Sequence, residues 1–259
     1  MCIRDSDGST DDTASVCAEF KVARLRNHYA LGNGAAIKAG ARVAKGDVLI
    51  FMDADGQHQP DDIPALLEKF AEGYDMVVGA RQSGSHAGAH RAVANDLFSR
   101  FASWMVMQNI QDLTSGFRVV RAEKFRKFMY LLPNGFSYPT TITMSFFRAG
   151  FAVGYVPIHT PRRVGNSHIR PLRDGVRFLL IIIKVGTLYS PQKLFLPVSA
   201  GFFLTGLAYY AYTFWTAGRF TNMSALMFIS AILTFLIGIV SEQISALHYK
   251  GMDDGEERR

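Results

Sequence analysis

Two long stretches without a charged residue occupy the C-terminal part of this 259-residue sequence. They read FLPVSAGFFLTGLAYYAYTFW at 195–215 and MSALMFISAILTFLIGIVS at 223–241. At a rise of about 1.5 Å per residue, each would form a helix roughly 30 Å long, which matches the hydrocarbon core of a bilayer. Two such stretches in close succession are difficult to bury inside a small soluble domain. We therefore expect a transmembrane hairpin within residues 192–248, with a pair of buried core helices as the weaker alternative.

The charges that flank the two spans predict the orientation of the hairpin. The connection between the spans holds one cation, Arg219, whereas basic residues precede the first span and HYKGMDDGEERR (248–259) ends the chain. Positively charged flanks tend to stay on the cytoplasmic side of a membrane. We therefore expect an integral membrane protein of a bacterial or archaeal inner membrane. Its N-terminal domain and the tail 249–259 would both lie in the cytoplasm.

The basic residues before the hairpin indicate an anionic partner. The chain carries a formal net charge of +6, and many of its cations lie within residues 162–193. Within 169–191, three cations fall within about 40° of one another on a helical wheel, namely Arg173, Arg177 and Lys184. This stripe favours an amphipathic juxtamembrane helix that binds membrane lipid, rather than an ordinary solvated face. We do not expect nucleic acid as a partner, because the cations lie beside membrane spans and lack interleaved aromatic residues.

Residues 1–168 are expected to form an α/β domain. Strand-like and helix-like segments alternate from residue 7 to about 160, which is typical of helices packed around a sheet. The expected strands are 47–52, 75–80 and 151–158, and the expected helices are 33–44 and 61–72. A turn at DGSTDD (7–12) is expected to open a further helix.

The strand at 47–52 ends directly before two aspartates, in the sequence VLIFMDADGQHQPDD (48–62). Asp53 and Asp55 would lie at the carboxyl end of a strand, where open α/β sheets bind their ligands. Two carboxylates one residue apart can address one Mg²⁺ or Mn²⁺ ion together with a diphosphate, and Gln57 adds a neutral oxygen. An acidic pair in an ordinary turn is the alternative when the motif is taken alone.

The order and spacing of four motifs resembles that of family 2 glycosyltransferases with the GT-A fold, a Rossmann-like nucleotide-sugar domain with a mostly parallel sheet. These motifs are DGSTDD, NGAAIKAG, GDVLIFMDADGQHQPDD and MVVGAR. Within that family, the chain is similar to the polyprenol-phosphate glycosyltransferases. The resemblance implies transfer of a sugar, with inversion, from a UDP- or GDP-linked donor to a polyprenyl phosphate. It also implies Mg²⁺ or Mn²⁺ as the cofactor.

The resemblance assigns roles to particular residues. It implies that the metal and the donor diphosphate are bound by Asp53, Ala54, Asp55 and Gln57. It implies contacts with the lipid phosphate for Arg81 and Arg91, and Asn95 stands where the family often has Ser. The block DLTSGFR (112–118) matches a family segment near the acceptor, and Arg118 is its most reactive member. The expected catalytic residues are Asp55, Arg81 and Arg118.

A second basic segment, RRVGNSH (162–168), resembles the Arg-x-x-Gly-x-Ser-Lys segment that closes over the donor diphosphate in the family. Arg162 and Ser167 keep the pattern, whereas His168 replaces the usual Lys. A histidine carries less positive charge than a lysine near neutral pH, so Arg163 or Arg170 would have to compensate, or the site is looser. Arg162, Ser167 and His168 are expected to bind substrate.

The beginning of the chain departs from the family pattern. Family members open with a strand that ends in a Pro-x-Tyr-Asn-Glu-like turn, followed by a strand that ends in Asp-Asp-Gly-Ser. This chain begins MCIRDSDGST, so Asp7 keeps a substrate-binding position while Ser6 replaces the first Asp. The segment MCIRDS also lacks the apolar character of a strand. We expect the first strand to be missing and the donor pocket to lack one wall.

Three other functions remain open at this stage. A processive polysaccharide synthase would usually carry a Gln-x-x-Arg-Trp motif, which this sequence lacks. A catalytically inactive membrane scaffold or sugar-nucleotide sensor is consistent with the altered beginning of the chain. A glycosyltransferase with a different acceptor would use the same donor motif. A membrane hairpin is also compatible with a homo-oligomer.

Overall fold

The computed structural model describes residues 3–6, 13–20, 22–26, 29, 31–81, 89–135, 137–160, 180, 183–184, 186–187 and 190–253. The chain divides into two compact units, Met1–Ile182 and Ile183–Arg259.

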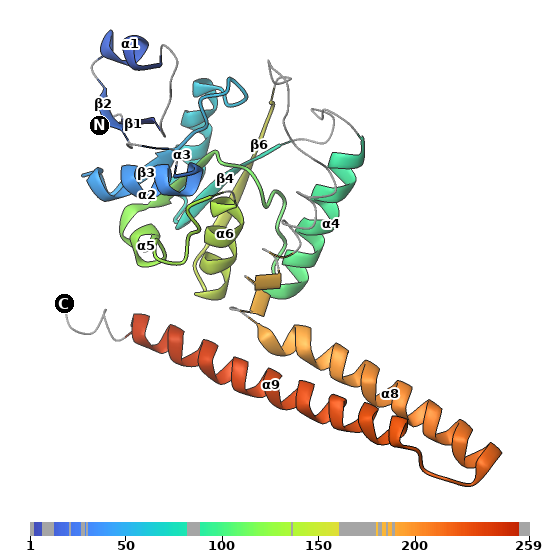
Figure 1. Cartoon of the computed structure of the whole chain (residues 1–259). Coiled ribbons are helices and arrows are strands. Elements are labelled where there is room, and N and C mark those ends of the chain that lie inside the picture. Colours follow the sequence, from blue (N-terminus) through green and yellow to red (C-terminus); the bar gives the residue numbers. More distant parts are fainter. Residues whose placement is uncertain are drawn as a thin grey trace. The chain divides into compact units, whose positions relative to one another are not determined.

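The first unit alternates strands and helices, as the sequence predicts. Its elements are β1 Ile3–Ser6, α1 Thr13–Ala18, β2 Ala23–Arg26, α2 Asn33–Val43, β3 Val48–Phe51, the 3₁₀ turn η1 Pro60–Asp62, α3 Ile63–Ala71, β4 Met76–Arg81, α4 Ala89–Val106, β5 Arg118–Arg121, α5 Ala122–Lys127, α6 Tyr138–Arg148 and β6 Val153–Ile158 (Figure 1). The structure confirms the predicted helices and strands between residues 33 and 80, and the strand near 151–158. It also confirms a helix after DGSTDD, namely α1.

The beginning of the chain forms a strand despite its polar composition. The segment MCIRDS lacks the apolar character of a strand, yet Ile3–Ser6 forms β1. This strand pairs with β2 in parallel, with Ile3 opposite Ala23 and Ser6 opposite Arg26. Backbone pairing with β2 therefore forms a strand that the side chains alone did not predict. Among the described residues, β1 and β2 form a sheet separate from the larger one.

The larger sheet has four strands in the order β3-β5-β4-β6. β4 pairs with β6 in parallel, whereas β5 runs antiparallel to both of its neighbours, β3 and β4. Three strands therefore share one direction, in keeping with the expected mostly parallel sheet, and β5 is the exception. As a result, the carboxyl ends of β3, β4 and β6 meet the amino end of β5 at one edge of the sheet.

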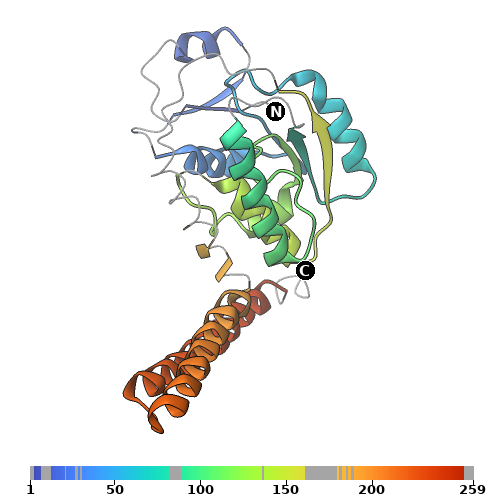
Figure 2. The ribbon, with the colours of Figure 1, turned by 90° about the vertical axis from the view of Figure 1, so that its right-hand side faces the viewer.

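Helices lie on both faces of the larger sheet (Figure 2). One face packs on α3 through a core cluster of Leu66, Phe70, Val77, Phe117, Val119 and Ile158. Because successive strand residues point to opposite faces, Met76 and Arg118 lie on the other face, where Arg118 contacts Thr143 of α6. The centre of the sheet is thus buried on both sides, as expected for an α/β domain, whereas Val48 and Ile50 of β3 are 39% and 40% exposed.

The amino end of α2 docks on the loop before α6. The N–H of Gly34 donates to the carbonyl of Gly135 at 3.2 Å, and the N–H of Ala35 donates to the carbonyl of Asn134 at 2.9 Å. Lys38 adds a hydrogen bond from Nζ to the carbonyl of Leu132 at 3.0 Å. Loop carbonyls thereby satisfy N–H groups that a helix leaves unpaired at its start. The close approach requires a residue without a side chain at Gly34.

The second unit consists of two long helices, α8 Pro191–Ala217 and α9 Asn222–Asp253, which pack side by side (Figure 1). Both are long and apolar enough to cross a membrane. In the most apolar 18-residue stretch of each helix, only 11% of α8 and 17% of α9 is buried. Small side chains line the contact at intervals of seven residues, namely Ser199, Gly206 and Thr213 on α8 and Ser224, Ala231, Gly238 and Ser245 on α9. Small residues allow helix backbones to approach closely in a membrane. Low burial disfavours the alternative of soluble core helices.

The docking of α2 generates a testable prediction about two glycines of this helix. A Cβ at Gly34 would lie 2.0 Å from the carbonyl oxygen of Pro133, whereas a Cβ at Gly40 would meet nothing within 4 Å. We expect Gly34→Ala to lower the free energy of unfolding by about 1–3 kcal/mol. Gly40→Ala, the matched control, should raise it by about 0.5–1 kcal/mol, because alanine favours a helix interior. Thermal unfolding of both variants in detergent measures the difference, and equal effects would contradict the docking.

Candidate functional site

The candidate site lies at the edge of the sheet where three strands end and β5 begins. Asp53 and Asp55 follow the end of β3, and Arg81 is the last residue of β4. The segment 112–117 leads into β5, whose first residue, Arg118, pairs with both neighbouring strands. Sheet pairing therefore brings together segments that are about 60 residues apart in the sequence.

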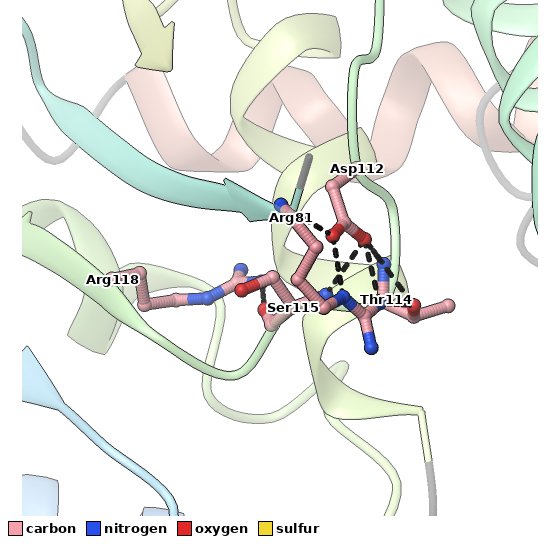
Figure 3. A network of polar contacts seen from close by, with 5 residues as sticks. All are labelled: Arg81, Asp112, Thr114, Ser115 and Arg118. Atoms are coloured by element: carbon pink, nitrogen blue, oxygen red, sulfur yellow. Dashed lines mark hydrogen bonds and ion pairs between the residues drawn. The ribbon is translucent and has the colours of Figure 1, made fainter. Parts of the chain in front are cut away.

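An ion pair between Arg81 and Asp112 joins the end of β4 to this segment (Figure 3). The Nε and Nη2 atoms of Arg81 donate to the two carboxylate oxygens of Asp112 at 2.8 and 2.9 Å, and Nη2 also contacts Thr114 Oγ1. The N–H groups of Thr114 and Ser115 donate to Asp112 Oδ1 at 3.0 and 3.1 Å. Asp112 is thus a buried carboxylate with several hydrogen-bond donors, and it fixes the plane of the Arg81 guanidinium.

These contacts keep Asp112 ionised. Burial would raise the pKa of the Asp112 carboxyl, but the hydrogen bonds and the positive charge of Arg81, together with the backbone donor of Thr114, outweigh burial and lower the pKa below its ordinary value. The pair is therefore charged at neutral pH.

Arg118 lies behind the same segment and is 0% exposed. Its Nη1 atom donates to the Pro139 carbonyl at 3.3 Å and to Thr143 Oγ1 at 3.2 Å, and Nη2 donates to the Ser115 carbonyl. The guanidinium also lies 5.6 Å from the ring centre of Tyr138. Burial lowers the pKa of Arg118, yet a guanidinium stays protonated in proteins. Complete burial argues against direct contact between Arg118 and a substrate, contrary to its expected reactive position, and makes it a support for the segment.

Gly116 provides space for the carboxylate of Asp53. A Cβ on Gly116 would lie 2.5 Å from Asp53 Oδ2, so the carboxylate rests against the bare backbone of the segment. The hydroxyl of Tyr138 donates to the Gly116 carbonyl at 3.1 Å. Burial raises the pKa of Tyr138, which keeps this hydroxyl protonated and able to donate.

The segment that carries the predicted metal ligands is folded by its own side chains. The N–H of Gln57 donates to Asp55 Oδ1 at 3.1 Å, and the N–H of Asp53 donates to His58 Nδ1 at 3.1 Å. The His58 ring stacks on Phe117, with ring centres 5.1 Å apart and planes inclined by 22°. Burial also lowers the pKa of His58. The structure therefore holds Asp53, Asp55 and Gln57 on one short loop beside β5.

The electrostatics of Asp53 suit a cation. Burial raises its pKa above the ordinary value; the carboxylate of Asp55 adds to the rise, and His58, Arg118 and Arg81 partly offset it. A bound cation would remove the repulsion between the two carboxylates.

The donor set fits a divalent cation that shares its coordination with a ligand. Within the described parts of the chain, no group of three or more His, Cys, Asp or Glu side chains forms a metal site. The oxygens of Asp53, Asp55 and Gln57 are the hard donors that Mg²⁺ and Mn²⁺ prefer, and Mg²⁺ is usually bound by one or two carboxylates together with substrate phosphates. These residues therefore suit a cation completed by a phosphate ligand rather than a cage made by the protein alone.

A cavity of about 350 Å³ reaches the metal motif from between α2 and β3. Its lining includes Ile3 of β1, Ala36 and Gly40 of α2, and Asp53 and Ala54 after β3. Among the residues that the structure describes, β3 is an edge strand of its sheet, and β1 and α2 contribute to the cavity wall on this side.

Several residues predicted from the sequence lie outside the described residues. These are Asp7, Arg162, Ser167 and His168, and the side chain of Arg91, whose backbone belongs to α4. The structure brings Asp53, Asp55 and Gln57 together on one loop beside Arg81 and places Arg118 beneath them. No role for Asp112, Gly116, Tyr138 or His58 was predicted from the sequence. The block DLTSGFR (112–118) contained a signal for two of these residues, because Asp112 and Gly116 precede Arg118 within it.

Two family models match the chain in separate regions. Residues 5–129 match the model described as glycosyl transferase family 2, and residues 190–247 match the model described as the GtrB C-terminal hairpin. The first region contains both sides of the candidate site, and the second contains α8 and most of α9.

Individual proteins resemble the chain along most of its length. A glycosyltransferase named AglJ from Haloferax volcanii is 28% identical, with 96% of this chain and 86% of the relative covered. A dolichyl-phosphate hexose transferase from the same organism is 26% identical over 69% of this chain and 78% of its own. The structure of glucosyl-3-phosphoglycerate synthase from Mycobacterium tuberculosis, solved with Mn²⁺, UDP-glucose and phosphoglyceric acid, is similar to this chain with a TM-score of 0.55 at 18% identity. The match covers 71% of this chain and 68% of the synthase chain. This likeness shows a shared GT-A fold.

The buried ion pair leads to a prediction about stability. Asp112→Asn leaves the charge of Arg81 without its partner and should lower the free energy of unfolding by about 1–3 kcal/mol at pH 7, because solvent reaches part of the Arg81 side chain and compensates some of the loss. Because the folded protein depresses the pKa of Asp112, the pair stabilises above the unfolded pKa of roughly 3.9, and the difference should shrink as pH falls below it. Thermal unfolding of wild type and variant across pH 3–7 measures this effect.

The exposed pair Asp96–Arg100, at 3.0 Å, provides a matched control. Asp96→Asn should change stability by less than about 1 kcal/mol, because solvent screens exposed ion pairs. Equal effects of the two substitutions would show that the Arg81–Asp112 pair does not stabilise the site edge.

Proposed function

We propose that this chain, whose residues 5–129 match the model of glycosyl transferase family 2, transfers a sugar from a nucleotide-sugar donor to a polyprenyl phosphate at a membrane. The observation that carries the proposal is that the loop with Asp53, Asp55 and Gln57 lies at the same end of a GT-A sheet as Arg81, whose charge acts on Asp53. The relative named as a dolichyl-phosphate hexose transferase supports the class of acceptor. The α8–α9 hairpin supports a membrane anchor close to such a lipid.

The reaction requires charge stabilisation more than proton transfer. A phosphate oxygen of the acceptor forms a bond to the anomeric carbon of the sugar, while the bond from that carbon to the donor diphosphate breaks and the nucleoside diphosphate leaves. Because the acceptor phosphate is already anionic, this step needs no general base, and attack from the opposite face inverts the anomeric centre. Asp53, Asp55 and Gln57 are the residues that would hold Mg²⁺ or Mn²⁺, which supplies positive charge to the leaving diphosphate.

Arg81 is the candidate contact for the acceptor phosphate. Asp112 binds its Nε and Nη2 atoms, and the Nη1 atom takes no part in that pair. The two hydrogen bonds to Asp112 thereby fix the direction of Arg81 Nη1, and a guanidinium held in this way can present its positive charge to a phosphate. Arg118 acts through the 112–117 segment rather than by contact with substrate, in line with its complete burial.

The remaining assignments follow from the family resemblance. Asp7, Ala54, Arg162, Ser167 and His168 are proposed on the donor side. Arg91 is proposed as a second contact for the acceptor phosphate. Lipid headgroups would bind the basic segment 169–191 on the cytoplasmic side, where the catalytic domain is proposed to lie.

The proposal is tested with membranes that contain the full chain. They are incubated with Mg²⁺ or Mn²⁺, radiolabelled UDP- or GDP-sugars, and undecaprenyl or dolichyl phosphate. Label that enters the organic phase and is blocked by EDTA is the expected result, and it identifies the donor. Nucleotide-sugar binding without transfer to any lipid would instead support a sensor.

Asp55→Ala should abolish this transfer while the protein stays in the membrane, because one of two carboxylates at the metal site is lost. We expect a decrease of at least about 100-fold in the rate of transfer. Glu68→Ala, on the exposed side of α3, is the matched control and should retain the wild-type rate. Transfer at the wild-type rate by Asp55→Ala would overturn the metal assignment.

The proposed orientation predicts the accessibility of two introduced cysteines. With Cys2 and Cys17 replaced by Ser, Arg219→Cys in the loop between the spans should react with an impermeant maleimide added outside intact cells. Gly251→Cys should react only after permeabilisation. The reverse pattern would place the catalytic domain on the opposite side of the membrane.

A further inference from the structure

We propose that His58 is a positioning residue that holds the main chain of the metal-binding loop in the conformation required for cation binding. This inference rests on the proposed metal site of Asp53, Asp55 and Gln57, and it adds a residue that contacts neither substrate nor cation.

The first link is the hydrogen bond from the N–H of Asp53 to His58 Nδ1, at 3.1 Å. A backbone N–H can only donate, so Nδ1 is the acceptor and Nε2 carries the ring hydrogen. The bond spans five residues and closes the loop on itself. Because it is made to the backbone of Asp53, it fixes the direction in which the chain leaves β3 and thus where the Asp53 side chain begins.

The second link is the stacking of the His58 ring on Phe117, with ring centres 5.1 Å apart. Phe117 is itself immobilised, since it is fully buried and its carbonyl accepts a hydrogen bond from Gly79 of β4 at 2.9 Å. The ring of His58 therefore connects the loop to the centre of the sheet.

The hydrogen bond and the ring stacking both help to position Asp53. His58 sets the backbone of Asp53, while Gly116, next to Phe117, sets the space for the Asp53 carboxylate. The bond from the Gln57 N–H to Asp55 Oδ1 then orients the second carboxylate within the closed loop. Positions of all three proposed ligands thus depend on one acceptor atom and one ring.

The geometry also excludes one direct role. The Nδ1 atom of His58 already accepts the Asp53 N–H, so it cannot at the same time bind a cation. Its effect on the metal therefore passes through the backbone.

Three substitutions separate the acceptor from the ring. His58→Asn places an oxygen where Nδ1 lies and removes most of the ring. His58→Phe keeps a ring on Phe117 and removes the acceptor. His58→Gln carries its amide further from the backbone, so it also loses the acceptor, and it provides a second variant if His58→Phe does not fold.

Mn²⁺ binding to the full chain in detergent is measured by electron paramagnetic resonance, with UDP and GDP added in turn, alongside the thermal midpoint. We expect His58→Phe and His58→Gln to weaken Mn²⁺ binding about tenfold or more, with a thermal midpoint near that of wild type. His58→Asn should remain within about threefold of wild type. A merely structural role would lower the thermal midpoint without this order among the variants.

Wild-type affinity for Mn²⁺ in both His58→Phe and His58→Gln would overturn the inference. An equal loss in His58→Asn and His58→Phe would overturn the role of the acceptor atom. Absence of Mn²⁺ binding by the wild type with either nucleotide would remove the metal site and this inference together. Sugar transfer by a wild-type protein whose His58 variants bind Mn²⁺ normally would remove the inference alone and leave the proposed function in place.

Discussion

The Arg81–Asp112 ion pair joins the end of β4 to the start of the segment that leads into β5, and the rest of the site is arranged around it. Asp112 is buried whereas the side chain of Arg81 is 31% exposed, so loss of Arg81 would leave an uncompensated buried carboxylate. Asp112 also binds the N–H groups of Thr114 and Ser115, so the same carboxylate shapes the turn in front of Gly116. Sheet pairing brings the two segments together, and the ion pair holds their ends in register.

The segment formed in this way separates the buried positive charge of Arg118 from the half-buried negative charges of Asp53 and Asp55. Arg118 lies beneath it, and none of the ion pairs among the described residues includes its guanidinium, so its charge is balanced at longer range by Asp112 and Asp53. Above the segment, Asp53 and Asp55 repel each other. Three carboxylates and two guanidinium groups leave one excess negative charge at this edge. This balance suits a divalent cation that arrives with a diphosphate, since the complex changes the local charge little.

The sequence predicted those parts of the molecule that depend on local patterns. The apolar run 48–51 and the small residues of 33–43 are sufficient to predict β3 and α2, and charge-free runs are sufficient to predict α8 and α9. Nothing local indicated that β5 runs antiparallel, because strand direction is set by pairing with residues far along the chain. For the same reason Arg118 was expected to be reactive. It is instead buried by residues far from it in the sequence, among them Met76 of β4 and Thr143 of α6. β1 was missed because its pairing with β2 outweighs its polar composition.

The two-unit organisation follows from the chemistry of the proposed substrates. A nucleotide-sugar is soluble and highly charged, whereas a polyprenyl phosphate keeps its chain in the bilayer and exposes only the phosphate. An enzyme for both needs a polar site on a water-soluble domain and an anchor that keeps this domain at the headgroup region. Under the proposed function, α8 and α9 would serve as such an anchor, because their small residues pack the helices against each other and leave apolar side chains such as Trp215 and Leu236 for lipid. Such anchoring would restrict the search for the proposed acceptor to the membrane plane, so the arginines at the site would need only to orient a phosphate that is already nearby.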